Sequence, residues 1–161
     1  MIEESQFTAE VERMQDMLYR VSAGILRNDA DAQDAVQQAL ENAWRSRHRV
    51  NADCFAPWLM RIVINTCKSH LRQQRRLIVT DQMEAFQRAA PPPDPSLRDA
   101  LERIPLKYRM PLLLHYMEGF SLAEIAGMLR LPVNTVKSRM YRGRNLLRAE
   151  WNEAEDMHDE A

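Results

Sequence analysis

Apolar residues recur at helical spacing through most of the chain, and no run alternates apolar and polar residues over the length of a strand. Phe7 to Leu26 forms the first such stretch, and a polar turn at Asn28 to Asp31 follows it. Asp31 to Arg45 and Phe55 to Arg76 repeat the pattern, with the polar loop Ser46 to Asp53 between them. The pattern predicts three amphipathic helices that share an apolar core in the first 76 residues.

The pattern breaks at Leu77 to Pro95, where four of the five residues from Pro91 to Pro95 are proline. Proline has no backbone donor and fixes its own φ, so this stretch cannot be helical. We expect residues 77–95 to be an extended, partly polyproline-like linker between two domains, with the two basic parts of the chain on different bodies.

Helical spacing resumes after the linker. Ser96 is expected to cap a short helix that ends before Pro105, and Leu106 to Met117 predicts a second one, bent at Met110-Pro111 and closed by Gly119. The whole chain is therefore predicted to be all-α, with two small helical domains joined by a Pro-rich linker.

The stretch from Phe120 to Leu147 has the pattern of a helix-turn-helix. Ser121 and Glu124 have the spacing of a capping box, and Pro132 should end the first helix near Arg130. The second helix is predicted to turn five small or apolar residues inward: Val133, Val136, Met140, Gly143 and Leu147. Its opposite side carries Asn134, Ser138, Tyr141, Arg142 and Asn145. With the two preceding helices this makes a four-helix domain at 96–151.

Charge is strongly segregated, although the net charge is only −1. Residues 45–76 hold eight bases and one acid, and residues 130–148 hold six bases and no acid. The last segment, 152–161, is acidic, and we expect it to be disordered. A short basic helix behind a tight turn is typical of proteins that enter a DNA major groove, and two basic blocks indicate two polyanion contacts.

The polar faces of the first domain can also be interpreted without any binding function. The cationic loop and helix at 46–76 have the composition of a single-strand binder, but Phe55 and Trp58 are spaced like core residues. Asp34, Gln37, Gln38 and Glu41 share a polar face, and spacing alone favours a solvated surface.

Several other functional classes are not expected. No apolar run is long enough to cross a membrane, and MIEESQF lacks the features of a signal peptide, so we expect a cytoplasmic protein. There is no nucleophile–base pair and no phosphate loop, so we expect neither an enzyme nor a cofactor. Cys54 and Cys67 match no zinc pattern and should be ordinary buried or half-buried thiols without metal.

Three segments together resemble a known family. DAQDAVQQALENAWR, FAPWLMRIVINTCKSHLRQQRR and IPLKYRMPLLLHYMEGFSLAEIAGMLRLPVNTVKSRMYRGRNLL are similar, in order and spacing, to segments of bacterial RNA polymerase sigma factors of the extracytoplasmic-function (ECF) group. The resemblance covers about residues 7–76 and 96–148.

The resemblance implies a role for each polar surface. Asp34, Gln37, Gln38 and Glu41 would dock on the clamp helices of the β′ subunit of core RNA polymerase, and Gln38 stands where an acid is usual. Residues 1–76 would also melt promoter DNA and read its −10 element through His48, Arg49, Arg61, Asn65, Lys68, Arg72, Arg75 and Arg76. The domain at 96–151 would contact the flap of the β subunit and read the −35 element through Thr135, Lys137, Ser138, Arg139, Tyr141, Arg142 and Arg144.

The resemblance further implies an anti-sigma factor as the inhibitor, and we consider separately that the acidic tail could shield the basic helix. Two alternatives stay open: a helix-turn-helix regulator that acts without polymerase, and a sigma mimic that sequesters another protein. The first would need a dimer interface or a ligand pocket, and the second would not need the basic stretch 46–76.

Overall fold

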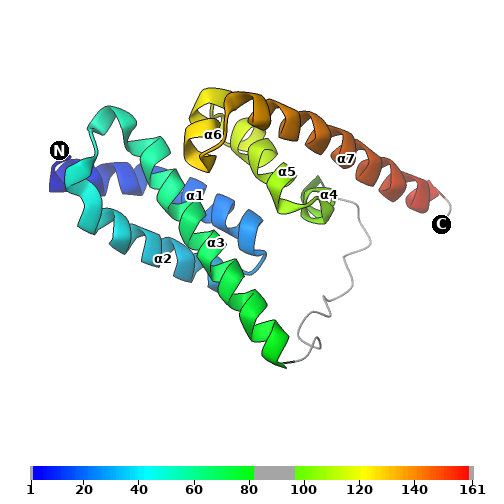
Figure 1. Cartoon of the computed structure of the whole chain (residues 1–161), viewed down its shortest axis with the longest axis horizontal. Helices are drawn as coiled ribbons and strands as arrows, with labels where there is room; N and C mark the ends of the chain where they lie inside the picture. Colours follow the sequence, from blue (N-terminus) through cyan, green and yellow to red (C-terminus); the bar gives the residue numbers. More distant parts are fainter. Residues whose placement is uncertain (1, 82–96, 160–161) are drawn as a thin grey trace.

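The computed structural model describes residues 2–81 and 97–159, with side chains for 2–76 and 99–152. Every regular element in these ranges is a helix, as predicted. In chain order they are α1 (Glu4–Leu26), α2 (Asp29–Ser46), the 3-10 turns η1 (Arg47–Arg49) and η2 (Ala52–Cys54), α3 (Phe55–Asp81), α4 (Leu97–Arg103), α5 (Leu106–Leu112), the π-helical turn η4 (Leu113–Met117), α6 (Leu122–Leu129) and α7 (Val133–Asp159). Figure 1 shows their arrangement.

The N-terminal domain is a bundle of α1, α2 and α3, each of which packs on the other two. The small residues Ala35, Ala39 and Ala43 of α2 are fully buried and allow the helices to approach closely. At one end the ring of Phe7 packs edge-on against Trp44 and Phe55, with ring centroids 5.2 and 5.5 Å apart. The prediction that Phe55 belongs to the core is therefore confirmed.

Two predicted boundaries of this domain differ from the structure. The turn at Asn28 to Asp31 is shorter than expected, because the side chain of Asn28 accepts a hydrogen bond from the backbone N–H of Asp31 (3.0 Å) and so starts α2 at Asp29. The predicted linker begins too early, because α3 continues from Arg76 to Asp81. No proline or glycine occurs before the proline run, so nothing breaks the helix there. Ser96 and the rest of the linker lie outside the described residues.

In the C-terminal domain, α5 and α7 pack closely at Gly143. A Cβ atom at Gly143 would lie 3.0 Å from both the backbone oxygen of Tyr108 and Cδ1 of Leu112, so only glycine leaves room for this contact. Pro111 cannot donate to the carbonyl four residues earlier, and directly after it the helix widens into η4. Gly119, with φ at +77°, then ends the segment as predicted.

The helix-turn-helix is built by α6 and the start of α7. Ser121 accepts from the backbone N–H of Glu124 (3.1 Å) and Glu124 accepts from that of Ser121 (3.3 Å), which confirms the capping box. The turn itself is made by Arg130, which adopts the left-handed conformation (φ 56°) that glycine usually takes. Val133, predicted to face inward, is 39% exposed because it begins the helix beyond the reach of α6.

The C-terminal segment does not have the predicted disorder, because α7 continues to Asp159. Residues 152–159 contain no glycine or proline, and alanine, glutamate and methionine favour a helix. The segment extends away from the turn (Figure 1), so it cannot fold back over the basic start of the same helix. The proposed shielding by the tail is therefore wrong for this arrangement.

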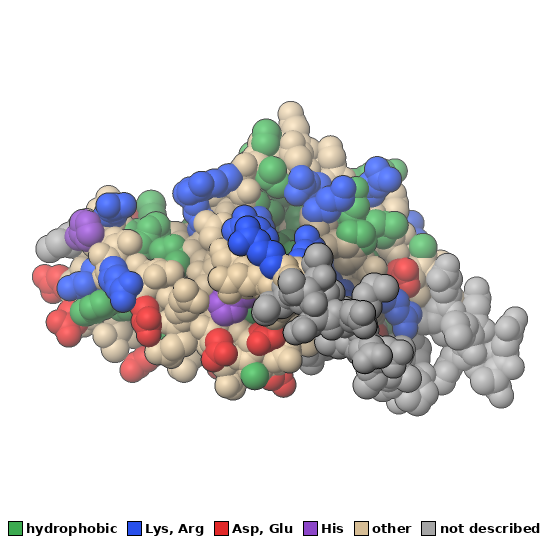
Figure 2. All heavy atoms as spheres, turned by 60° about the horizontal axis from the view of Figure 1, so that its bottom comes forward, with side chains coloured by type: hydrophobic (Ala, Val, Ile, Leu, Met, Phe, Trp, Pro, Cys, Tyr) green, Lys and Arg blue, Asp and Glu red, His purple; other side chains and the backbone are tan. Residues whose placement is uncertain are grey.

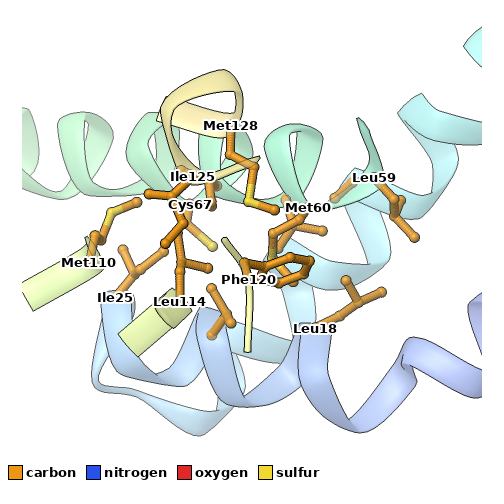
Figure 3. Packing of buried hydrophobic residues seen from close by; sticks show 14 of the residues in the cluster. Leu18, Ile25, Leu59, Met60, Cys67, Met110, Leu114, Phe120, Ile125 and Met128 are labelled. Atoms are coloured by element: carbon orange, nitrogen blue, oxygen red, sulfur yellow. The ribbon is translucent and has the colours of Figure 1, made fainter. Parts of the chain in front are cut away.

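The two domains share one apolar core, which the sequence did not predict. Figure 3 shows Leu114, Phe120, Ile125 and Met128 of the C-terminal domain meeting Met60 and Cys67 of α3 and Ile25 of α1. On the other side of this interface Arg20 forms two hydrogen bonds with Glu118. The expectation that the two basic blocks lie on different bodies is therefore wrong for this structure, in which α3 packs directly on α6.

Within the described residues, no helix combines the length and the apolar character that a membrane crossing requires.

Candidate nucleic-acid and polymerase interfaces

The first half of α7 presents an exposed polar face beyond the helix-turn-helix. Lys137, Ser138, Tyr141, Arg142 and Asn145 line a shallow hollow of about 540 Å³. Tyr141 is 65% exposed, which is unusual for an aromatic residue and fits a surface that contacts a partner. The guanidinium of Arg142 lies 5.7 Å from the ring centroid of Tyr108, which limits its freedom. The structure thus brings together four of the residues predicted to read the −35 element.

The other three predicted residues lie apart from this hollow. Thr135 is half-buried, and Arg139 is half-buried in a cleft against α3. Arg144 Nη1 donates to the hydroxyl of Tyr116 (3.1 Å), an exposed aromatic on η4. Helical spacing predicts Tyr116 to be a core position of the helix at 106–117, and this is wrong, because its side chain is 60% exposed.

The loop before α3 presents exposed cations at the end of the N-terminal domain. His48 and Arg49 are exposed, as expected for a nucleic-acid contact. Arg47 shapes the loop: its guanidinium stacks 3.7 Å from the ring centroid of Trp44 and donates to the Trp44 carbonyl (2.7 Å). This contact orders the start of the loop, where the 3-10 turn η1 forms in a segment predicted to be irregular.

The predicted −10 face of α3 is split along the helix. Arg61 is half-buried and Asn65 is exposed, whereas Lys68, Arg72 and Arg75 line a cleft beside the C-terminal domain. Burial lowers the pKa of Lys68, and the nearby charges of Arg139 and Arg72 lower it further. Figure 2 shows Lys and Arg side chains gathered around hydrophobic ones on this side of the molecule, with acidic side chains below them. Arg76 lies beyond this cleft and is exposed.

The polar face of α2 is fully accessible. Asp34, Gln37, Gln38 and Glu41 are all exposed. Oε1 of Gln38 lies 3.0 Å from Nε2 of His70 on α3, which fixes the orientation of its amide. Beside this face an apolar groove of about 310 Å³ runs between α1 and α2, lined by Phe7, Thr8, Val11, Leu40, Glu41 and Trp44. Helical spacing assigns the apolar residues of this lining to the core and gives no sign of the groove.

The cysteines do not form a site. Cys54 is exposed, so the expectation of a buried or half-buried thiol is wrong for it, because η2 turns its side chain outward. Cys67 is buried and burial raises the pKa of its thiol to about 11, which keeps it protonated and unreactive. Among the described residues, no group of three or more His, Cys, Asp or Glu side chains could hold a metal ion.

Two families match separate parts of the chain. Residues 11–77 match "Sigma-70 region 2", and residues 95–147 match "Sigma-70, region 4". The first range covers most of α1 and α3 with all of α2, and the second covers the helix-turn-helix and the helices before it.

Curated relatives extend the similarity over both domains. The RNA polymerase sigma factor SigV of Bacillus subtilis is 31% identical over 135 residues, which cover 81% of each chain. The RNA polymerase sigma factor CarQ of Myxococcus xanthus is 33% identical over 154 residues, or 90% of this chain and 86% of CarQ.

Solved structures share the fold. The sigma factor RpoE of Bartonella quintana, solved with the anti-sigma factor NepR, superposes with a TM-score of 0.79 at 22% identity, covering 91% of this chain and 96% of RpoE. CnrH, solved with the cytosolic domain of CnrY, gives a TM-score of 0.70 at 24% identity, covering 91% of this chain and 88% of CnrH.

Proposed function

The chain belongs to the ECF group of sigma-70 RNA polymerase sigma factors, and we propose that its two domains divide promoter recognition as their exposed surfaces suggest. It is a promoter-recognition protein rather than an enzyme. The observation that carries the assignment of surfaces is the polar hollow on α7, which holds Lys137, Ser138, Tyr141 and Arg142 beyond a capped helix-turn-helix.

The C-terminal domain, residues 96–151, reads the −35 element with this hollow. Lys137 and Arg142 supply charge for phosphates and hydrogen-bond donors for guanine, while Ser138 and Tyr141 offer shorter polar contacts. Thr135, Arg139 and the Tyr116-bound Arg144 lie outside the hollow. We assign them to contacts with the DNA backbone, which Arg139 can make only once the cleft against α3 opens. The same domain contacts the β flap of the polymerase.

The N-terminal domain, residues 1–76, binds the β′ clamp helices and melts the −10 element. The exposed face of Asp34, Gln37, Gln38 and Glu41 supports the clamp contact, and the adjoining apolar groove adds area that a partner helix can bury. For the −10 element, the exposed loop residues His48 and Arg49 and the α3 residues Arg61, Asn65, Lys68, Arg72, Arg75 and Arg76 provide a cationic track for a single strand.

Reading both elements requires the domains to separate. The −35 and −10 elements are named for their base-pair positions, which differ by 25, or about 85 Å along a straight duplex. In this structure, however, Lys68 of the −10 set and Arg139 of the −35 set line one cleft. The described conformation is therefore a closed one. An anti-sigma factor, the kind of partner with which RpoE was solved, would act on such a conformation.

The test is reconstitution with bacterial core RNA polymerase. The purified chain is incubated with core enzyme, the complex is isolated by size exclusion, and run-off transcription is measured on genomic fragments. We expect a one-to-one complex and promoter-dependent transcripts. The variant Asp34→Ala/Gln37→Ala should lose polymerase binding, while its binding to −35 DNA stays unchanged. Glu12→Ala/Gln15→Ala, which alters the exposed side of α1, is the matched control and should retain both.

Other outcomes identify the alternatives. Sequence-specific DNA binding by folded protein without polymerase binding would support an independent helix-turn-helix regulator. Polymerase binding that blocks transcription, or no binding to either partner, would support a sigma mimic.

A further inference from the structure

A cleft of about 580 Å³ lies between α3 and the C-terminal domain and is lined by five cations. Lys68, Arg72 and Arg75 come from α3, Lys107 comes from α5, and Arg139 comes from α7. Among the residues that the structure describes, no aspartate or glutamate lines the cleft. Walls of low polarity that carry charges of one sign concentrate the electric field inside a cleft, so an anion is attracted into it.

The remaining lining of the cleft is mostly apolar. Leu71, Pro105, Leu106, Met110, Leu129 and Leu131 complete it. Leu106, Leu129 and Leu131 are only half-buried, so their side chains are available to a bound molecule. A ligand that matches this cleft has both a strongly anionic part and a part that can lie against leucine side chains.

The positive charges of the cleft are not neutralised by the described part of the protein. None of the five cations takes part in an ion pair between described residues. Arg72 donates to the hydroxyl of Ser69 (3.1 Å), and Nζ of Lys107 lies 4.9 Å from the ring centroid of Tyr108, which are both neutral partners. Burial lowers the pKa of Lys68, and the nearby positive charges of Arg139 and Arg72 lower it further.

We propose that this cleft binds a nucleoside polyphosphate, with the phosphate chain among Lys68, Arg72, Lys107 and Arg139 and the base against the leucines. A cleft of this volume is within the range of small-molecule sites and is too small for a DNA duplex. Guanidinium groups favour phosphates because they can donate two parallel hydrogen bonds to one phosphate group.

The ligand would hold the two domains together. Its site takes residues from both domains, so it exists only in the closed conformation, and binding stabilises that conformation by mass action. Lys68, Arg72 and Arg139 are then unavailable to DNA. The nucleotide would therefore act as a brake on promoter binding, separate from any protein inhibitor.

The test measures binding to the full chain in the absence of polymerase, so its result does not depend on sigma activity. ATP, GTP, inorganic tripolyphosphate and adenosine are titrated by calorimetry in 150 mM NaCl, roughly physiological ionic strength. We expect saturable binding of at least one nucleotide, weaker binding of tripolyphosphate, and no binding of adenosine. The bound nucleotide should also raise the thermal unfolding temperature.

Variants distinguish binding in the cleft from attraction of the nucleotide to surface charge in general. Lys107→Ala and Arg139→Ala should each weaken nucleotide binding by about tenfold, because each removes a charge-assisted contact. Lys137→Ala removes an equal charge from the outer face of α7 and should change binding by less than about twofold. Circular dichroism and thermal unfolding check that each variant is folded.

Four results would overturn the proposal. The first is no saturable binding of any phosphate compound, and the second is an equal loss in all three variants, which would indicate surface charge alone. The third is tripolyphosphate binding as tightly as the nucleotides, which would assign the cleft to an inorganic phosphate chain. The fourth is displacement of the nucleotide by a short single-stranded oligonucleotide that binds more tightly, which would assign the cleft to nucleic acid.

Discussion

Arg20 of α1 and Glu118 of the C-terminal domain are joined by two parallel hydrogen bonds, from Nε to Oε1 and from Nη2 to Oε2, each 3.0 Å long. The Glu118 side chain is only 3% exposed, whereas that of Arg20 is 52% exposed. The pair raises the pKa of Arg20, mainly through its hydrogen bond with Glu118. It fastens the two domains at the edge of their shared core.

Arg20→Ala should destabilise the chain by about 1–3 kcal/mol, because the nearly buried carboxylate of Glu118 loses its partner. Urea unfolding measures the change. Arg13→Ala is the control, since Arg13 pairs with Glu10 on the exposed surface of the same helix and should cost less than about 0.5 kcal/mol. A double-mutant cycle with Glu118→Ala that shows no coupling would contradict this role.

Two glycines in helices should respond in opposite ways to alanine. Gly143→Ala should destabilise by about 1–3 kcal/mol, because the new methyl would press on the Tyr108 backbone oxygen and on Leu112. Gly127→Ala should stabilise by about 0.5–1 kcal/mol, since nothing lies within 4 Å of the added atom and alanine favours a helix. Thermal unfolding distinguishes the two. Equal effects would show that the contact between α5 and α7 is looser than described.

Cys67 should make the fold sensitive to alkaline pH. Burial raises the pKa of the Cys67 thiol in the folded protein to about 11, above its value in the unfolded chain. The neutral buried thiol therefore makes its full contribution to the free energy of unfolding below about pH 8.5, and this contribution is lost as the pH rises toward 11. The loss is on the order of 3 kcal/mol. Urea unfolding of the wild type and of Cys67→Ala between pH 8 and 11 isolates this difference from other titrating groups. A constant difference between the two proteins would refute it.

The same cysteine should be protected from thiol reagents in the native protein. Ellman's reagent should modify the exposed Cys54 rapidly at neutral pH and Cys67 only on unfolding. The variant Cys54→Ser, which keeps only the buried thiol, provides the direct measurement. Rapid modification of that variant would indicate that the domains separate readily.

Lys68→Met should stabilise the closed protein. The folded-state pKa of Lys68 is lowered, so its protonated form is disfavoured by folding, and stability rises as the amine deprotonates at alkaline pH below about 10.4. Removing the charge should raise Tm by about 1–3 °C at low salt and by less at high salt. Lys137→Met, on an exposed face, should leave Tm unchanged. A lower Tm for Lys68→Met would mean that Lys68 has an attractive partner.

Arg142→Ala should reduce discrimination between −35 sequences. A bidentate contact from arginine to a guanine contributes about 1–3 kcal/mol of discrimination. Single base changes that weaken the binding of the wild type should therefore reduce the affinity of the variant by a smaller factor. Ser5→Ala, on the exposed start of α1, is the control and should discriminate between −35 sequences as the wild type does. If Arg142→Ala weakens binding to all sequences equally, Arg142 contacts phosphate rather than a base.

Local features were predictable from the sequence because each depends on neighbouring residues. The Ser121–Glu124 capping box, the exposed Ser138, Tyr141 and Arg142, and the glycine end at Gly119 all follow from spacing and residue chemistry. Arg130 shows the limit of such predictions: an arginine takes the left-handed conformation that glycine usually adopts, because the tight turn requires it.

Contacts between distant segments were not predictable. Arg139 lies on the same helix as the exposed Lys137, yet it faces Lys68 across a cleft because α6 packs on α3. Helical spacing predicts which side of a helix a residue lies on, but not which other element packs against that side. The continuation of α7 to Asp159 has a different cause: the acidic residues 152–159 include no helix breaker, and this outweighs their acidic composition.

The apolar core shared by the domains has a consequence for rates. Met60, Cys67, Leu114 and Ile125 are each fully buried where the two domains meet, so separating the domains exposes as much packed surface as a partial unfolding event. Such openings are slow and accelerate steeply with temperature. The lifetime of the closed conformation should therefore shorten steeply as the temperature rises.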